Sequence, residues 1–207
     1  MNKNRLIRVV TVLILGLGIA AAIAAYQIQH KKNSDLESFD KKTSSVVAKD
    51  FGGAFTLTNQ EGIRVTEKDF DGTKRLIYFG FTYCPAICPT ELQKITTALN
   101  DLGEQADDIT PIFITVDPER DTVETMKQYV ELFHPRLVGL TGSLAQIEQA
   151  KKAYKIYAAK VQDETMSDYT MDHSSFIYLI DEADNLRRIF KVDDTAEDIT
   201  SYIKNNF

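Results

Sequence analysis

The two cysteines of this chain lie four positions apart, at Cys84 and Cys88. Sulfurs at this spacing can form a disulfide or bind the same soft metal ion. The pair follows an apolar strand predicted over 76–80, and an amphipathic helix is expected to begin at Pro89, because proline is favoured at the first helical position. Cys88 would then lie at the helix N-terminus, where the partial positive charge favours the thiolate. The pair therefore predicts redox chemistry or metal binding.

A purely structural disulfide is a weaker explanation for the pair. It would close so short a loop that it would restrict the unfolded chain little. Residues 51–207 are also numerous enough to bury a core without such a cross-link.

Of the three histidines, His173 is the one placed to join the cysteines. His30 lies among lysines, and His134 ends a predicted helix, where a positive charge suits the helix C-terminus. His173 precedes a predicted strand over 176–180. We expect this strand beside the one that leads to Cys84, so that the two loops face each other.

Two thiolates and an imidazole form a soft site with three ligands, Cys84, Cys88 and His173. Sulfur selects Cu(I), the imidazole also suits Cu(II), and zinc could use the same set with one open position. Asp172 is a candidate for orienting the imidazole from behind. The residues alone leave copper and zinc open.

The elements that must position these ligands alternate between strands and helices. The β-α-β units imply parallel strands with right-handed crossovers, and a closing hairpin adds antiparallel strands. This order predicts an α/β, thioredoxin-like fold: a mixed sheet with helices on both faces and an N-terminal hairpin insertion. The expected elements are a hairpin over 55–65, strand 75–80, helix 89–102, strand 111–116, helix 122–133 capped by Asp121 with Glu124, strand 138–140, helix 144–154 capped by Ser143 with Gln146, a hairpin over 176–190, and a helix opened by Thr195.

A run of acidic and basic residues, 117–121, follows the strand predicted over 111–116. Asp117 and Arg120 would lie at the carboxyl side of the sheet, where α/β proteins place function. They are candidates for supporting the ligands or docking a partner. The alternative is an Asp-Pro turn followed by a helix cap.

A membrane anchor is predicted at the N-terminus. Residues 9–26 carry no charge, and residues 1–8 contain three basic residues and no acid. The length fits a transmembrane helix better than a cleaved signal peptide, whose alternative cleavage signal lies at 22–24. The charge pattern places residues 1–8 in the cytoplasm and the domain across the membrane. Residues 27–50 are polar and read as a tether to the domain over 51–207.

The charge of the chain argues against a nucleic-acid partner. The formal net charge is −6, and every acidic residue lies after residue 32. A nucleic-acid-binding domain would need a basic face.

Five stretches of the chain carry a resemblance to a known family: 78–82, 84–92, 113–121, 134–141 and 172–174. Taken in this order, they are similar to the SCO/SenC family of copper-binding oxidase assembly proteins. The resemblance runs over 52–190. It implies a thioredoxin fold, copper ligands at Cys84, Cys88 and His173, and a role in building the binuclear copper A centre of cytochrome c oxidase. Ala86 departs from the family pattern, which often has an acid between the cysteines.

We therefore expect a copper-binding assembly factor, not an enzyme, that handles Cu(I) or Cu(II). Its expected partners are the copper A subunit of the oxidase, the membrane through the N-terminal helix, and a copper donor or thiol reductant. The expected location is the bacterial inner membrane, single-pass, with the domain in the periplasm, or the mitochondrial inner membrane facing the intermembrane space. The alternative is a thiol–disulfide oxidoreductase that uses a redox-active Cys84–Cys88 disulfide to keep the oxidase cysteines reduced. Oxidoreductases of this fold place a cis-proline near the position of His173, and none of the five prolines lies there. A peroxidase is disfavoured because nothing beyond the fold suggests a peroxide pocket.

Overall fold

The computed structural model describes residues 51–162 and 168–207. The predicted anchor over 9–26 and the tether over 27–50 lie outside the described residues. Within the described residues, no helix combines the length and the apolar character that crossing a membrane requires.

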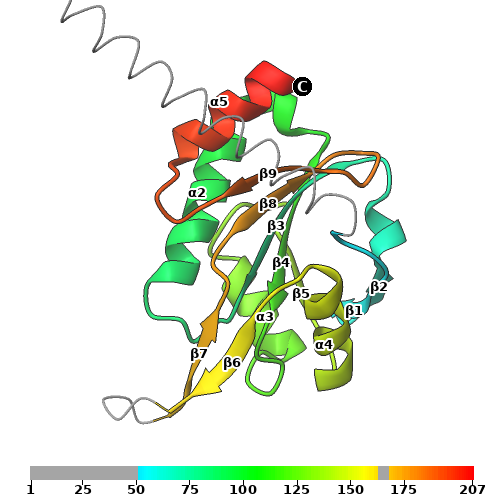
Figure 1. Ribbon diagram of the computed structural model, residues 1–207, viewed down its shortest axis with the longest axis vertical. Coiled ribbons are helices and arrows are strands. Elements are labelled where there is room, and N and C mark those ends of the chain that lie inside the picture. The colour runs from blue at the N-terminus through cyan, green and yellow to red at the C-terminus, as the bar shows by residue number, and fades with distance from the viewer. Residues whose placement is uncertain (1–50, 163–167) are drawn as a thin grey trace, which may run out of the picture. The chain divides into compact units, whose positions relative to one another are not determined.

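The centre of the domain is a seven-stranded mixed sheet with the strand order β2-β1-β5-β4-β3-β8-β9 (Figure 1). Strand β3 pairs in parallel with β4 and antiparallel with β8. The mixed sheet and both predicted hairpins are confirmed. The strands are β1 (Thr56–Asn59), β2 (Arg64–Thr66), β3 (Lys74–Gly80), β4 (Ile109–Thr115), β5 (Val138–Thr141), β8 (Ile177–Ile180) and β9 (Leu186–Phe190).

Four α-helices surround this sheet in the described part of the chain. Two of them begin with capping boxes, in which each pair of residues satisfies two backbone N–H groups. One is the predicted pair Ser143 with Gln146; in the other, Thr195, the predicted start of the last helix, pairs with Asp198. The helices are α2 (Ile87–Leu102), α3 (Val123–Val130), α4 (Leu144–Ala153) and α5 (Ala196–Asn206), with short 3₁₀ turns η2 (Glu67–Phe70) and η3 (Gly103–Ala106).

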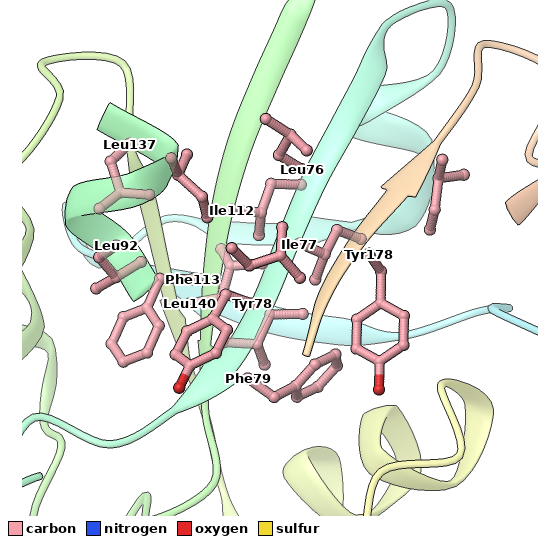
Figure 2. Packing of buried hydrophobic residues seen from close by; sticks show 14 of the residues in the cluster. Leu76, Ile77, Tyr78, Phe79, Leu92, Ile112, Phe113, Leu137, Leu140 and Tyr178 are labelled. Carbon is pink, nitrogen blue, oxygen red and sulfur yellow. The ribbon is translucent and has the colours of Figure 1, made fainter. Parts of the chain in front are cut away.

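Adjacent residues of β3 show that helices cover both faces of the sheet. Tyr78 stacks on Phe113 of β4, which in turn contacts Tyr129 of α3. Phe79 points to the other face and contacts Tyr154 at the end of α4. Successive side chains of a strand point to opposite faces, so these two neighbours belong to two core layers. Figure 2 shows both rings among the buried residues of β3, β4 and β8.

Two predicted helix starts differ from the structure. Helix α2 begins at Ile87 and not at Pro89, and proline is tolerated in this first turn because its missing N–H would have no partner inside the helix. Helix α3 is capped by Thr122, whose side chain accepts a hydrogen bond from the Thr125 N–H at 3.2 Å, and not by Asp121 with Glu124. The Asp121 carboxylate turns inward instead.

One element was not predicted. Strands β6 (Ala158–Val161) and β7 (Thr170–His173) form a separate two-stranded antiparallel sheet. Their residues are mostly exposed or half-buried. A short polar hairpin of this kind lacks the apolar alternation by which a strand is recognised in a sequence.

Candidate metal centre

The two cysteines meet at the start of α2. Cys84 lies in the loop between β3 and α2 and is half-buried, whereas Cys88 is the second residue of the helix and fully buried. The backbone N–H of Cys88 donates a hydrogen bond to the Cys84 Sγ at 3.4 Å. Both thiols are free. The helix N-terminus therefore points its amide groups at the sulfur of the loop.

This geometry makes Cys84 the acidic thiol of the pair. The hydrogen bond from the Cys88 thiol, followed by those from the backbone N–H groups of Cys88, Ala86 and Ile87, lowers the pKa of Cys84 to about 5 in spite of burial. The same hydrogen bond and burial raise the pKa of Cys88. The expectation that Cys88 itself would be the activated thiol is wrong. The backbone N–H groups at the start of α2 donate hydrogen bonds to the sulfur of Cys84 and not to the sulfur of Cys88.

Alkylation of the reduced protein should therefore modify Cys84 much faster than Cys88. Since the pKa of Cys84 is lowered to about 5, its thiolate predominates at pH 7, and the rate should fall only as the pH drops through about 5. Brief iodoacetamide treatment followed by peptide mass spectrometry measures both sites. A Cys84→Ser variant, in which Cys88 is the only thiol, provides the control. Equal labelling of both cysteines at pH 7 would contradict this assignment.

His173 reaches the cysteines from the neighbouring loop, as its position before β8 predicts. Its Nε2 lies 3.6 Å from the Cys88 Sγ. Its Nδ1 lies 3.0 Å from the Ser174 carbonyl oxygen. A proton on Nδ1 donates to that carbonyl and leaves the lone pair of Nε2 facing the cysteine. The ring packs edge-on against Phe81 and Tyr78.

The spacing of these atoms fits two ligands of one metal ion. With bonds of about 2.3 Å to sulfur and about 2.0 Å to nitrogen, as found for zinc, two ligands lie roughly 3.5 to 3.7 Å apart at tetrahedral to trigonal angles. The observed 3.6 Å falls within this range. Over 51–162 and 168–207, however, no three His, Cys, Asp or Glu side chains already form a complete metal-binding group. A bound ion would replace the thiol proton that now joins Cys88 to Cys84.

Two residues behind Cys88 were not recognised as part of the site. The Tyr78 hydroxyl donates a hydrogen bond to the Cys88 Sγ at 3.6 Å. A Cβ added to Gly80 would lie 2.8 Å from the same sulfur, so only glycine fits there. Both belong to an apolar strand, and their only sequence signal was their place in a stretch that resembles the SCO/SenC family.

The three other candidate residues, Asp172, Asp117 and Arg120, lie in different surroundings from one another. Asp172 is exposed on β7, and the contact that orients the His173 ring comes from the Ser174 carbonyl. Asp117 is buried and paired with Arg120, whose Nε donates to the Asp117 Oδ2 at 2.6 Å. The roles of these three residues therefore remain predictions.

Asp121 was expected only as a helix cap, but it holds the cysteine loop. Its buried carboxylate accepts hydrogen bonds from the Thr82 N–H at 3.1 Å, the Thr82 hydroxyl at 2.6 Å and the Thr115 hydroxyl at 2.5 Å. Burial raises the pKa of Asp121, and these hydrogen bonds oppose that shift. The carboxylate thus joins the loop before Cys84 to the end of β4.

Together, the sheet and the site define a thioredoxin-like protein with two cysteines at a helix start and a histidine on the facing loop. The SCO1/SenC family model matches residues 43–207, and the chain belongs to this family. Protein sco1 of Schizosaccharomyces pombe is 40% identical over 92% of this chain and 74% of its own length. The chain spans 55% and 52% of the mitochondrial relatives from Arabidopsis thaliana and Homo sapiens.

Two solved structures bear on the chemistry. Bradyrhizobium japonicum ScoI with copper bound is 43% identical, with a TM-score of 0.69 over 76% of this chain and 99% of that chain. BsSco, described as having a disulfide switch and as a member of the Sco family of cytochrome c oxidase assembly proteins, is 28% identical, with a TM-score of 0.59 over 76% of this chain and 94% of that chain. These similarities confirm the thioredoxin-like architecture.

Proposed function

We propose that this protein binds copper through Cys84, Cys88 and His173 and acts as an assembly factor for the binuclear copper A centre of cytochrome c oxidase. The observation that carries the proposal is the 3.6 Å approach of His173 Nε2 to the Cys88 Sγ, beside the acidic thiol of Cys84. Soft sulfur suits Cu(I), and the imidazole extends the site to Cu(II). Copper bound to ScoI, a relative that is 43% identical, favours copper over zinc.

The position of the domain in the cell follows from the N-terminal sequence. An anchor over 9–26 and a tether over 27–50 would hold the domain on the far side of the membrane, in the periplasm or the intermembrane space. Tethering raises the effective concentration of a copper carrier near a membrane-bound oxidase subunit. The copper A subunit is the partner that this arrangement would serve.

A thiol–disulfide oxidoreductase is the second candidate. The free thiols and the lowered pKa of Cys84 favour it, because a thiolate attacks a partner disulfide. Such an enzyme would use Cys84 for attack and the buried Cys88 to release the mixed disulfide. It has no need of an imidazole whose Nε2 faces the Cys88 Sγ, so His173 separates the two functions.

Anaerobic copper titration of the reduced full-length chain tests the first candidate. The wild-type chain should bind one copper ion tightly, and Cys84→Ser or Cys88→Ser should abolish tight binding because each removes a thiolate ligand. The His30→Ala variant controls for the loss of a histidine that is not one of the proposed ligands. Undiminished copper binding by either cysteine variant would exclude this ligand set.

A further inference from the structure

Arg120 lies between the two segments that carry the candidate ligands. Its guanidinium carbon is 4.8 Å from the ring centroid of Tyr83 and 3.7 Å from that of Tyr169. Tyr83 directly precedes Cys84. Tyr169 directly precedes β7, which ends at His173. One side chain therefore contacts the cysteine loop and the histidine strand at the same time.

Hydrogen bonds fix this guanidinium in place. Its Nε donates to the Asp117 Oδ2 at 2.6 Å, and its Nη1 donates to the Tyr169 carbonyl at 2.9 Å. The Tyr169 hydroxyl donates to the other oxygen of Asp117 at 2.9 Å and closes the ring of contacts. The Asp117 side chain is 1% exposed and that of Arg120 is 13% exposed. Charge-assisted hydrogen bonds with so little exposure hold their geometry far better than surface ion pairs do.

The position of the histidine strand depends on side-chain contacts, among them that of Met171, which is buried in the core. Within residues 51–162 and 168–207, strands β6 and β7 pair only with each other and form no ladder with the seven-stranded sheet. One ion pair between this hairpin and the turn after β4 joins Lys160 and Glu119, whose side chains are 45% and 54% exposed. An exposed pair of this kind contributes little. The buried contacts of Arg120 are therefore well placed to set the position of β7.

We propose that Arg120 is a positioning residue that sets the distance between the cysteine pair and His173. The proposal rests on the proposed copper-binding function. Arg120 acts through the two tyrosines and through Phe81, whose ring centroid lies 5.9 Å from its guanidinium carbon and whose ring packs edge-on against His173. Its planar guanidinium can stack on aromatic rings as a cation while donating several hydrogen bonds in its own plane; lysine lacks the planar fork, and glutamine lacks the positive charge.

The loss of Arg120 should change the affinities for Cu(I) and for Cu(II) by different amounts. Cu(I) can be held by the two thiolates, whereas Cu(II) prefers more ligands, including nitrogen. Loss of a residue that orients a ligand typically lowers metal affinity about tenfold to hundredfold. We expect Arg120→Gln to weaken Cu(II) binding at least about tenfold and Cu(I) binding less than about threefold.

The test compares Arg120→Gln with Lys127→Gln in the full-length chain. Lys127 is a matched control because its substitution also removes one positive charge, and its ion pair with Glu61 is exposed. Cu(I) and Cu(II) affinities and the Cu(II)–thiolate absorption band are measured for both variants, each alone and combined with His173→Ala. If Arg120 acts through His173, Arg120→Gln has no further effect on copper once the imidazole is gone.

A second measurement needs no metal. In the reduced, metal-free protein, amide hydrogen exchange over 158–161 and 170–173 should be severalfold faster in Arg120→Gln than in wild type, and unchanged in Lys127→Gln. Unchanged exchange would overturn the proposal. Equal losses of Cu(I) and Cu(II) affinity, or the same loss in the His173→Ala background, would also overturn it by indicating a general structural role. If wild type itself binds no copper, the proposed function fails, and hydrogen exchange still decides whether Arg120 positions β7.

Discussion

Oxidation of Cys84 and Cys88 to a disulfide should abolish copper binding, and a reductant should restore it completely. The disulfide consumes both thiolates that the metal requires. The two side chains already share a hydrogen bond at the start of α2, so the bond can form with little movement of the chain. The expected result is one copper ion per chain in the reduced protein and none in the oxidised protein.

The measurement is copper content after desalting of oxidised, reduced and re-reduced samples of the same preparation. A sample carried through oxidation and re-reduction controls for irreversible damage to the sulfurs. Equal copper uptake by the oxidised and reduced proteins would count decisively against these ligands. If the oxidised protein binds no copper, as expected, a protein in an oxidising compartment needs a reductant before each loading with copper.

Substitution of His173 by alanine should leave the cell without a complete cytochrome c oxidase when copper is limiting. The variant keeps both thiolates and part of its Cu(I) affinity, but it loses the nitrogen that Cu(II) prefers. The purified protein should therefore lack the Cu(II)–thiolate absorption band. In cells, the oxidase should lack its binuclear copper centre while its haem content is largely kept, as in a strain without the protein.

Oxidase activity, copper content and haem spectra of the membranes measure this outcome. Cys84→Ser and Cys88→Ser should behave in the same way, and added copper should partly rescue the His173→Ala strain. The His30→Ala strain provides the control for the same substitution at a histidine that is not one of the proposed ligands. Full oxidase activity in the His173→Ala strain under copper limitation would favour the reductase, because that reaction requires only the two thiols.

The candidate ligands could be predicted from the sequence for two reasons. The elements that carry them have local sequence patterns, and the chain contains few residues that could bind a soft metal. Apolar runs and capping residues delimit β3, α2 and β8, and these elements determine where the loops of Cys84 and His173 begin. With two cysteines and three histidines in the chain, few ligand sets were available. The antiparallel pairing of β3 with β8 then brought the two loops together, as the expected topology requires.

The residues that hold the ligand loops in place could not be predicted, because their roles depend on contacts between residues far apart in the sequence. Arg120 meets Tyr169 49 positions away, and Asp121 meets Thr82 39 positions away. The expected capping role of Asp121 followed a correct local rule, but Thr122 satisfied the helix end and left Asp121 free to turn inward. The periodicity of the sequence does not show whether Asp121 or Thr122 caps the helix.

The sequence by itself thus determined the order of the elements that build the seven-stranded sheet, its mixed pairing and the residues able to bind a soft metal, since these follow from apolar patterning and side-chain chemistry. Only the tertiary structure decided which cysteine is acidic, because the hydrogen bonds to Cys84 depend on how the loop folds over the first turn of α2. It also decided that His173 ends a strand of the separate β6–β7 hairpin and that Arg120 joins this hairpin to the cysteine loop. These features arise from packing and burial between distant segments, whose energies no local pattern of residues encodes.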